Sequence, residues 1–243
     1  MFVLSINIKP MKNYLNHSDC SNCDIFNNGF FSHNSAEAKK WFGNDNCRQL
    51  IYQKGETVVK QGAFASHLLY IKTGLVKIVI EGESGKNIII DFLKSGSFVG
   101  LPAVIGEEYY PFTINTLKPS DICLIKKDRF NEFLETKPET FIKLQELNNK
   151  IYKHLFEKIA VVGTKQMHGR LAHALLYLNE EELYSEDIFS FITRKDIAEF
   201  VGMSSESMVR LLNEFKADKL ITIKGKKIIV TDKEMLARLY RVG

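Results

Sequence analysis

The chain is poor in cysteine and proline, and it has no long apolar run. Four cysteines among 243 residues are too few for a disulfide-stabilised scaffold. No stretch approaches the roughly 18 to 20 consecutive apolar residues that cross a bilayer. The apolar patch at the N-terminus lacks the basic start and the small-residue cleavage site of a secretion signal. The sequence therefore predicts a cytoplasmic protein without a membrane partner.

Motifs that carry catalytic chemistry are also missing. The sequence contains no G-x-S-x-G, no P-loop and no H-E-x-x-H. We therefore predict that the protein is not an enzyme. Its formal net charge of +4 is small for its length, so overall charge neither requires nor excludes a nucleic-acid partner.

Residues 193–220 predict two short helices around a tight turn. Thr193 with Asp196 three residues later is close to a capping box at the start of the first helix. Gly202 stands where the chain must turn sharply, and Ser204 is a good cap for the second helix. The second helix has an apolar stripe at helical spacing, made of Met208, Leu211, Leu212 and Phe215.

The opposite face of the second predicted helix is polar. Glu206, Arg210 and Asn213 stand at i, i+4 and i+7, so they point the same way. An arginine can donate two hydrogen bonds to guanine, and a glutamate can accept one from cytosine. This face is typical of DNA readout, although a solvated Glu206–Arg210 pair on an ordinary amphipathic helix would give the same pattern.

Residues 220–230 predict a β-hairpin directly after these helices, with Lys224 and Gly225 at its turn. A hairpin after a helix-turn-helix forms a winged helix. Lys224, Lys226 and Lys227 would lie near its tip, where lysines meet DNA phosphates. The segment from Met203 to Val230 contains six Lys or Arg and three Asp or Glu, an excess of three positive charges.

The first half of the chain is rich in short β-type runs that alternate with glycines. Many short strands at near-regular spacing predict a sandwich, barrel or roll. The predicted strands are 50–52, 57–59, 67–71, 76–80, 87–92, 113–115 and 122–125.

A long helix is predicted over residues 137–162, followed by a second helix over 166–178. The long helix carries one apolar stripe, made of Leu144, Leu147, Ile151, Leu155, Ile159 and Val162. Such a stripe is typical either of a helix buried in its own chain or of a two-stranded seam between protomers. A seam would suit a helix-turn-helix protein, because two-fold dimers read two half-sites.

From about Leu50 to the C-terminus, the arrangement resembles the Crp/Fnr family of bacterial transcription regulators. The resemblance depends on the order and spacing of short motifs. These are Tyr52–Glu56 with Lys60–Gly62, Leu69–Gly74, Gly96–Gly100, Gly169–Ala172 with Leu175–Leu178, Thr193–Ala198 and Gly202–Arg210.

The resemblance implies an α+β fold with three parts. Residues 1–136 would form a sensor domain built as a double-stranded β-helix or jelly roll (a β-roll), with 1–40 as a variable segment. Residues 137–164 would be the dimerisation helix and 165–243 the winged helix-turn-helix domain. The family further implies a homodimer on a palindromic site in double-stranded DNA, an effector bound at the roll, and RNA polymerase as a partner.

Residue roles at the DNA also follow from the resemblance. Glu206 and Arg210 fall on the two base-reading positions, and Arg194 falls on a phosphate-contacting position. Ser205 replaces an arginine of the cyclic-AMP-binding members, which implies a partly different half-site. The predicted DNA-contacting residues are Thr193, Arg194, Ser204, Ser205, Glu206, Ser207, Val209, Arg210, Asn213, Lys226 and Lys227.

The family residues that bind cyclic AMP are absent from this sequence, so cyclic AMP is not the predicted effector. Cyclic-AMP-binding members have a glutamate after the second glycine of the Gly96–Gly100 segment and an Arg-Ser pair about ten residues later. Here these positions are Leu101 and Pro111-Phe112, and a buried phosphate without its cation is costly. The predicted pocket is apolar, or packed shut, and its residues are Gly100, Leu101, Val104, Ile105, Tyr109, Tyr110 and Phe112.

The cysteines leave an alternative open. Cys20 and Cys23 form a C-x-x-C, and Cys123 falls where the oxygen-sensing branch of the family has a ligand of its iron–sulfur cluster. The third cysteine of that branch is replaced by Gly29, and Cys47 is a displaced fourth thiol. Cys123 also fits as a small core residue of a strand. A redox or small-molecule module that signals to a protein partner is therefore the alternative function.

Overall fold

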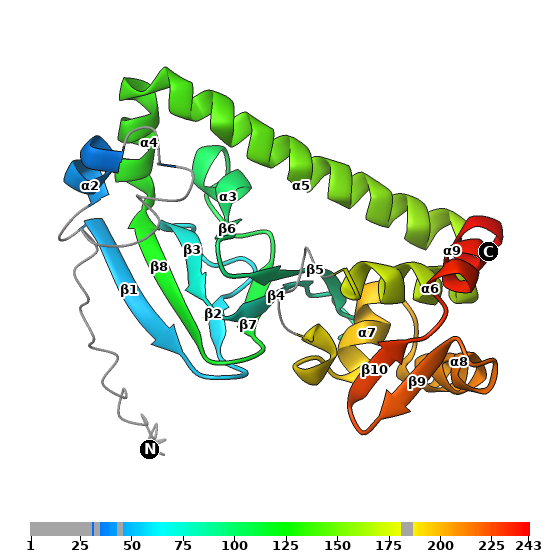
Figure 1. Ribbon diagram of the computed structural model, residues 1–243. Helices are drawn as coiled ribbons and strands as arrows, with labels where there is room; N and C mark the ends of the chain where they lie inside the picture. The colour runs from blue at the N-terminus through cyan, green and yellow to red at the C-terminus, as the bar shows by residue number, and fades with distance from the viewer. Residues whose placement is uncertain (1–30, 32–34, 43–45, 181–186) are drawn as a thin grey trace, which may run out of the picture.

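The computed structural model describes residues 31, 35–42, 46–180 and 187–243. Figure 1 shows a β-roll, one long helix above it, and a small helical domain with a hairpin at the far end. The roll and the helices that flank it comprise α2 (Ser35–Phe42), β1 (Cys47–Tyr52), β2 (Thr57–Val59), β3 (His67–Thr73), β4 (Leu75–Ile80), β5 (Ile88–Lys94), β6 (Phe98–Val99), α3 (Leu101–Ile105), β7 (Thr113–Thr116), β8 (Ser120–Lys126) and α4 (Lys127–Thr136).

Two four-stranded antiparallel sheets form the roll. The strand order is β1-β8-β3-β6 in one sheet and β2-β7-β4-β5 in the other. Aliphatic side chains from both sheets meet in a shared core, made of Leu69, Ile71, Val76, Val99, Ile114 and Ile122. The predicted β-roll is confirmed, and each of the seven predicted strands overlaps an observed one. The two-residue strand β6 and helices α3 and α4 were not predicted.

A close approach explains one glycine of the family pattern. Gly74 joins β3 to β4 with a φ of 120°. A Cβ at this position would lie 2.2 Å from the Ser120 side-chain oxygen of β8. The roll can therefore close at this corner only with glycine.

Helices α2 and α4 pack on the sheet that contains β1, β8 and β3. Their contact is mainly aromatic: the rings of Phe42 and Phe133 are 5.1 Å apart, and Phe31 lies 5.6 Å from Phe133. Leu144, from the start of the next helix, is buried in the same cluster.

The long helix α5 (Pro138–Thr164) follows, and it runs from the roll to the C-terminal domain (Figure 1). Its 27 residues span about 40 Å. Within the described residues, neither this helix nor any other is long and apolar enough to cross a membrane.

The C-terminal domain is a winged helix. It comprises α6 (Met167–Leu178), η4 (Ile188–Ser190), α7 (Arg194–Val201), α8 (Ser205–Ala217), β9 (Ile221–Lys224), β10 (Lys227–Val230) and α9 (Lys233–Val242). The hairpin turn lies one residue later than predicted, because Lys224 pairs with Lys227 and leaves Gly225 and Lys226 as the two-residue loop. Such loops need a positive φ, and Gly225 supplies it at 61°.

Candidate nucleic-acid interface and effector cavity

The turn between α7 and α8 is held by side-chain caps. The Thr193 hydroxyl accepts a hydrogen bond from the Asp196 amide at 3.1 Å, and the Asp196 carboxylate accepts one from the Thr193 amide at 2.7 Å. This is a full capping box. Gly202 then ends α7 in the left-handed region with a φ of 68°. The Ser204 hydroxyl accepts from the Ser207 amide and starts α8.

The two faces of α8 have different environments. The predicted apolar stripe is buried: Met208, Leu211, Leu212 and Phe215. Glu206, Arg210 and Asn213 are exposed on the other side. Arg210 lies 3.6 Å from Glu214 rather than pairing with Glu206. The polar face of α8 is therefore presented to solvent with its arginine held by a surface ion pair, which is weak.

The other predicted DNA-contacting residues surround this face. Thr193, Ser204, Ser205 and Val209 are exposed, while Arg194 and Ser207 are half-buried. Thr193 is the N-cap of α7, and the others belong to α7, to α8 or to the turn between them.

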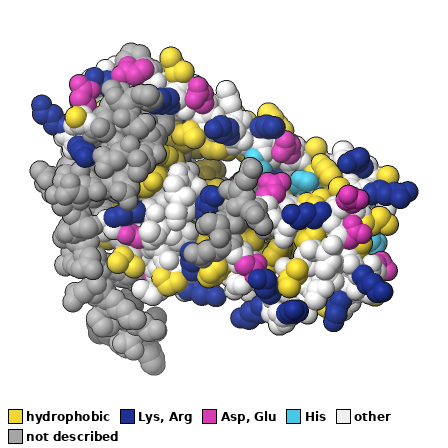
Figure 2. All heavy atoms as spheres, viewed as in Figure 1, with side chains coloured by type: hydrophobic (Ala, Val, Ile, Leu, Met, Phe, Trp, Pro, Cys, Tyr) yellow, Lys and Arg dark blue, Asp and Glu magenta, His cyan; other side chains and the backbone are white. Residues whose placement is uncertain are grey.

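The wing carries two of the predicted phosphate contacts. Lys226 is exposed in the loop of the hairpin. Lys227 is exposed too, but its ammonium nitrogen lies 3.1 Å from a carboxylate oxygen of Asp187. In Figure 2, Lys and Arg side chains gather at the lower right, where Figure 1 places α8 and the wing. The structure thus brings the predicted lysines to the same end of the molecule as the polar face of α8.

The long helix α5 has apolar side chains on two sides. Most of the predicted stripe faces inward, since Leu144 is buried, and Ile151 and Leu155 line a cavity against the roll. Ile159 is the exception within this stripe, because its side chain is 66% exposed. A second set lies outward and exposed, made of Phe141, Ile142, Tyr152, Phe156 and Ile159. Tyr152, Phe156 and Ile159 stand at i, i+4 and i+7, so they share one face. We define these three residues as the outer face of α5.

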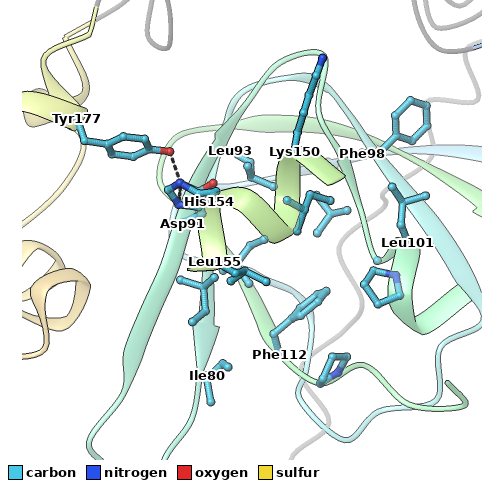
Figure 3. Close-up of a pocket in the computed structure, with 17 residues that line it drawn as sticks. Ile80, Asp91, Leu93, Phe98, Leu101, Phe112, Lys150, His154, Leu155 and Tyr177 are labelled. Carbon is cyan, nitrogen blue, oxygen red and sulfur yellow. Dashed lines mark hydrogen bonds and ion pairs between the residues drawn. The ribbon is translucent and has the colours of Figure 1, made fainter. Parts of the chain in front are cut away.

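A cavity of about 480 Å³ lies between α5 and the roll. Figure 3 shows side chains from strands of the roll, from α3 and from the middle of α5 along its border. Its apolar lining includes Ile78, Ile80, Leu93, Phe98, Leu101, Phe112, Ile151 and Leu155. Its polar side chains are Asp91, Lys150, His154 and Tyr177. A volume of this size is typical of small-molecule sites.

The predicted pocket residues divide between this cavity and other places. Gly100, Leu101 and Phe112 line it. Tyr110 does not, which corrects the sequence-based prediction: its hydroxyl donates to the His67 carbonyl at 2.5 Å, and its ring is buried beside Ala65 and Ala103. Ile105 and Tyr109 are exposed. Helix α3 includes Val104, whose side chain lies outside the described part.

The cysteines are only partly described. Cys47 and Cys123 are buried cysteines on the neighbouring strands β1 and β8. They belong to an apolar cluster that also contains Phe31 and Phe130. Cys20 and Cys23 lie outside the described residues. Within the described residues, no group of three or more His, Cys, Asp or Glu side chains could hold a metal.

Two family models cover more than half of the chain. The cyclic nucleotide-binding domain matches residues 49–137, and the Crp-like helix-turn-helix domain matches residues 169–239. The first range covers the roll and the second the winged helix, in the same order. The chain belongs to the Crp/Fnr family of transcription regulators.

Relatives of this Crp/Fnr regulator are transcription regulators rather than enzymes. The cAMP-activated global transcriptional regulator CRP of Salmonella typhimurium is 26% identical over 196 residues, which are 79% of this chain and 92% of that protein. The fumarate and nitrate reduction regulatory protein of Escherichia coli is 28% identical over 198 residues, covering 79% of this chain and 78% of that protein.

Solved structures of low identity share the fold. FixK2 from Bradyrhizobium japonicum has a TM-score of 0.71 at 18% identity and covers 79% of this chain and 96% of that one. The c-di-GMP responsive regulator CLP from Xanthomonas campestris has a TM-score of 0.70 at 21% identity, with coverages of 81% and 99%.

A polar junction that was not predicted from the sequence connects the roll to the winged helix of this Crp/Fnr regulator. The Tyr177 hydroxyl of α6 donates to the Asp91 carboxylate of β5 at 2.8 Å. His154 of α5 stacks on Tyr177, and its Nε2 atom lies 3.6 Å from the same carboxylate oxygen of Asp91. Burial raises the pKa of Asp91, although His154 and Tyr177 act against this effect. The junction therefore joins the roll, α5 and the winged helix beside the cavity (Figure 3).

One helical turn further along α5, Lys158 is buried between the two domains, with 8% of its surface exposed. Its ammonium group donates to the Phe200 carbonyl at 2.8 Å and lies 3.3 Å from the centre of the Phe200 ring. Burial lowers the pKa of Lys158 to about 7, and the nearby Asp91 only partly offsets this effect. No local sequence pattern marks this lysine, because its burial depends on a contact with Phe200, 42 positions away in the chain.

The lowered pKa of Lys158 predicts a pH-dependent stability. The unfolded lysine keeps a pKa of 10.5, so between pH 7 and 10.5 the unfolded chain holds one more proton here than the folded chain. The free energy of unfolding should therefore rise with pH in this window, by up to about 1.4 kcal/mol per pH unit from this group. In Lys158→Met this contribution is absent. Urea unfolding at pH 7.5 and 8.5, at equal protein concentration, measures the difference between the two slopes.

The matched control for this experiment is Lys153→Met, because Lys153 lies on the same helix with its side chain 79% exposed. This control should keep the wild-type slope. Equal slopes for the wild type and Lys158→Met would contradict the assignment of a low pKa to Lys158.

Proposed function

We propose that this regulator binds an inverted-repeat DNA site as a homodimer, with α8 reading base edges and the wing contacting phosphates. The observation that carries the proposal is the exposed row of Glu206, Arg210 and Asn213 on a helix whose opposite face is buried. Arginine and glutamate match the hydrogen-bonding edges of guanine and cytosine. Side-chain caps at both helix starts keep this row in a fixed place on the domain.

The outer face of α5 supports the homodimer. Phe156 is 69% exposed and Ile159 is 66% exposed, on a helix that carries the chain between its two domains. A two-fold dimer through this face would set two copies of α8 side by side, as two half-sites about one helical turn apart require. RNA polymerase is a further proposed partner on family grounds, and the cytoplasm is the proposed location.

For the effector, we propose a small and mainly apolar molecule in the cavity between α5 and the roll. The CRP of Salmonella typhimurium is named as cAMP-activated, but the cavity here has no arginine among its described lining residues. Leu101 and Pro111 occupy the positions where the cyclic-AMP-binding members have their glutamate and arginine. The lysine of the lining, Lys150, is exposed, so a cyclic phosphate would lose its hydration without gaining a buried cation in exchange.

Selection of sites from random double-stranded DNA by the full-length chain tests the DNA-binding proposal directly. The expected result is an inverted repeat whose half-sites are about 10 to 10.5 base pairs apart, centre to centre. Enrichment of no sequence above background would contradict sequence-specific binding.

The effector proposal predicts that cyclic AMP does not bind. Millimolar cyclic AMP should leave the thermal unfolding temperature of the full-length chain unchanged, because a ligand that binds the native state raises this temperature by mass action. The cAMP-activated regulator of Salmonella typhimurium, measured alongside, serves as the positive control. A saturable increase in the unfolding temperature of this chain would contradict the proposal.

A further inference from the structure

The first helix of the helix-turn-helix is contacted at its N-terminus by the sensor sheet. Lys77 of β4 donates to the Asp196 carboxylate at 2.5 Å, and the two side chains are 20% and 7% exposed. Asp196 is also the residue that completes the capping box of α7 with Thr193. Burial alone would raise the pKa of Asp196, but the hydrogen bonds from Lys77 and Thr193 outweigh it, so the pKa lies below its ordinary value. The Asp196 carboxylate is therefore charged at neutral pH, and it accepts hydrogen bonds both from Thr193 at the cap and from Lys77 of the sheet.

The same helix is contacted at its C-terminus by α5. The last carbonyls of a helix have no partner within the helix, and they carry the negative end of its dipole. Lys158 donates to one of them, the Phe200 carbonyl, while its Nζ atom lies over the Phe200 ring. A lysine side chain can donate this hydrogen bond with or without its extra proton, and a buried carbonyl that loses its donor is costly.

Apolar packing connects these two polar contacts. The rings of Phe92 on β5 and Phe200 on α7 are 5.3 Å apart. The core of the winged helix continues without interruption into the roll, where it includes Val79 and Ile89. The Tyr177–Asp91 hydrogen bond closes the same interface from the side of the cavity.

We propose that Lys77 and Lys158 are positioning residues that fix the helix-turn-helix on the sensor half from both ends of α7, and that the pose they fix is the one that reads DNA. The second statement rests on the proposed function. It is supported by the exposed polar face of α8, since the described residues leave Glu206, Arg210 and Asn213 open to solvent in this pose. A dimer must hold two such faces at a fixed separation. Movement of α7 relative to the roll in either protomer would therefore reduce the affinity for DNA.

The test compares Lys77→Met, Lys158→Met and the double variant with the wild type in the full-length chain. Affinity for the selected DNA site should fall by about tenfold in each single variant, a typical coupling between two sites. Amide hydrogen exchange of the free protein should speed up in α7 and β5 and stay unchanged in α6 and α8. This pattern distinguishes undocking of the domain from its unfolding. Lys77→Arg keeps the charge and the reach, so it should restore both readouts.

The matched control is Lys60→Met, because Lys60 makes an ion pair with Glu81 inside the roll and contacts no helix of the winged domain in the described residues. Its DNA affinity and exchange should equal those of the wild type. Unchanged or tighter DNA binding in Lys77→Met and Lys158→Met would overturn the proposal, as would faster exchange spread equally over α6, α7 and α8. If the wild type selects no DNA site, the proposed function fails, while the exchange pattern still decides whether the two lysines hold α7.

Discussion

Replacing Arg210 with alanine is expected to weaken binding to the selected DNA site at least about 30-fold. A bidentate arginine–guanine contact is worth about 1 to 3 kcal/mol, and a homodimer makes it twice, once in each half-site. The ion pair with Glu214 at 3.6 Å must open before Arg210 reaches a base, but a surface pair of this kind costs less than about 1 kcal/mol. Titration of labelled DNA with the full-length protein at fixed salt measures the loss.

The Arg210→Ala variant should also lose sequence specificity, and this loss distinguishes a contact to a base from a contact to a phosphate. Loss of Arg210 should reduce discrimination at one base pair of each half-site, whereas loss of a phosphate contact would weaken all sequences alike. Arg238→Ala is the matched control, because Arg238 is exposed on α9, away from the polar face of α8. It should leave both affinity and specificity unchanged. Equal binding by the Arg210→Ala variant and the wild type would show that Arg210 does not read a base directly.

The helix-turn-helix was predictable because local rules define it. Ser204, Gly202 and the capping box at Thr193 mark helix ends within a few residues, and the stripe from Met208 to Phe215 follows the helical period. The seven strands were predictable for the same reason, since glycines and β-branched runs alternate along the chain. Their pairing into a roll required the family resemblance, because adjacent strands such as β1 and β8 are far apart in sequence.

The long helix α5 was predicted with nearly correct bounds, but the role of its stripe was ambiguous. An apolar stripe does not say whether it meets its own chain or a second copy. The structure shows that Leu144, Ile151 and Leu155 face the roll or its cavity. Tyr152, Phe156 and Ile159 then remain on the outer face, and their spacing is just as helical. The predicted stripe placed Ile159 with the inward residues, whereas the structure places it on the outer face.

The cavity and the interdomain contacts depend on pairs that no local pattern reveals. Lys77 and Asp196 are 119 positions apart in the chain. Lys158 and Phe200, whose carbonyl accepts from the lysine, are 42 positions apart. Tyr110 was predicted to line the pocket, yet its hydroxyl donates to the His67 carbonyl and its ring is buried beside Ala65 and Ala103.

Replacing Phe156 with aspartate is expected to give a monomer and to reduce DNA affinity by about 10²- to 10⁴-fold. In a two-fold interface each change occurs twice, so the variant would bury two like charges in place of two aromatic rings. A monomer binds a single half-site and loses the gain from linked sites, which is typically of this size. Because Phe156 is 69% exposed in one chain, the fold of the protomer should be retained. Sedimentation velocity and the same DNA titration measure the two effects.

Phe64→Asp is the matched control for this change. Phe64 is 62% exposed and lies on the roll beside Tyr109, so it carries the same chemistry away from α5. It should remain a dimer with unchanged DNA affinity. A Phe156→Asp protein that sediments as a dimer and binds DNA normally would show that the outer face of α5 is not the dimer seam. In that case the apolar side chains of α5 would serve, within the described residues, to pack against the roll and to line the cavity. The two copies of α8 would then have to be paired through another surface.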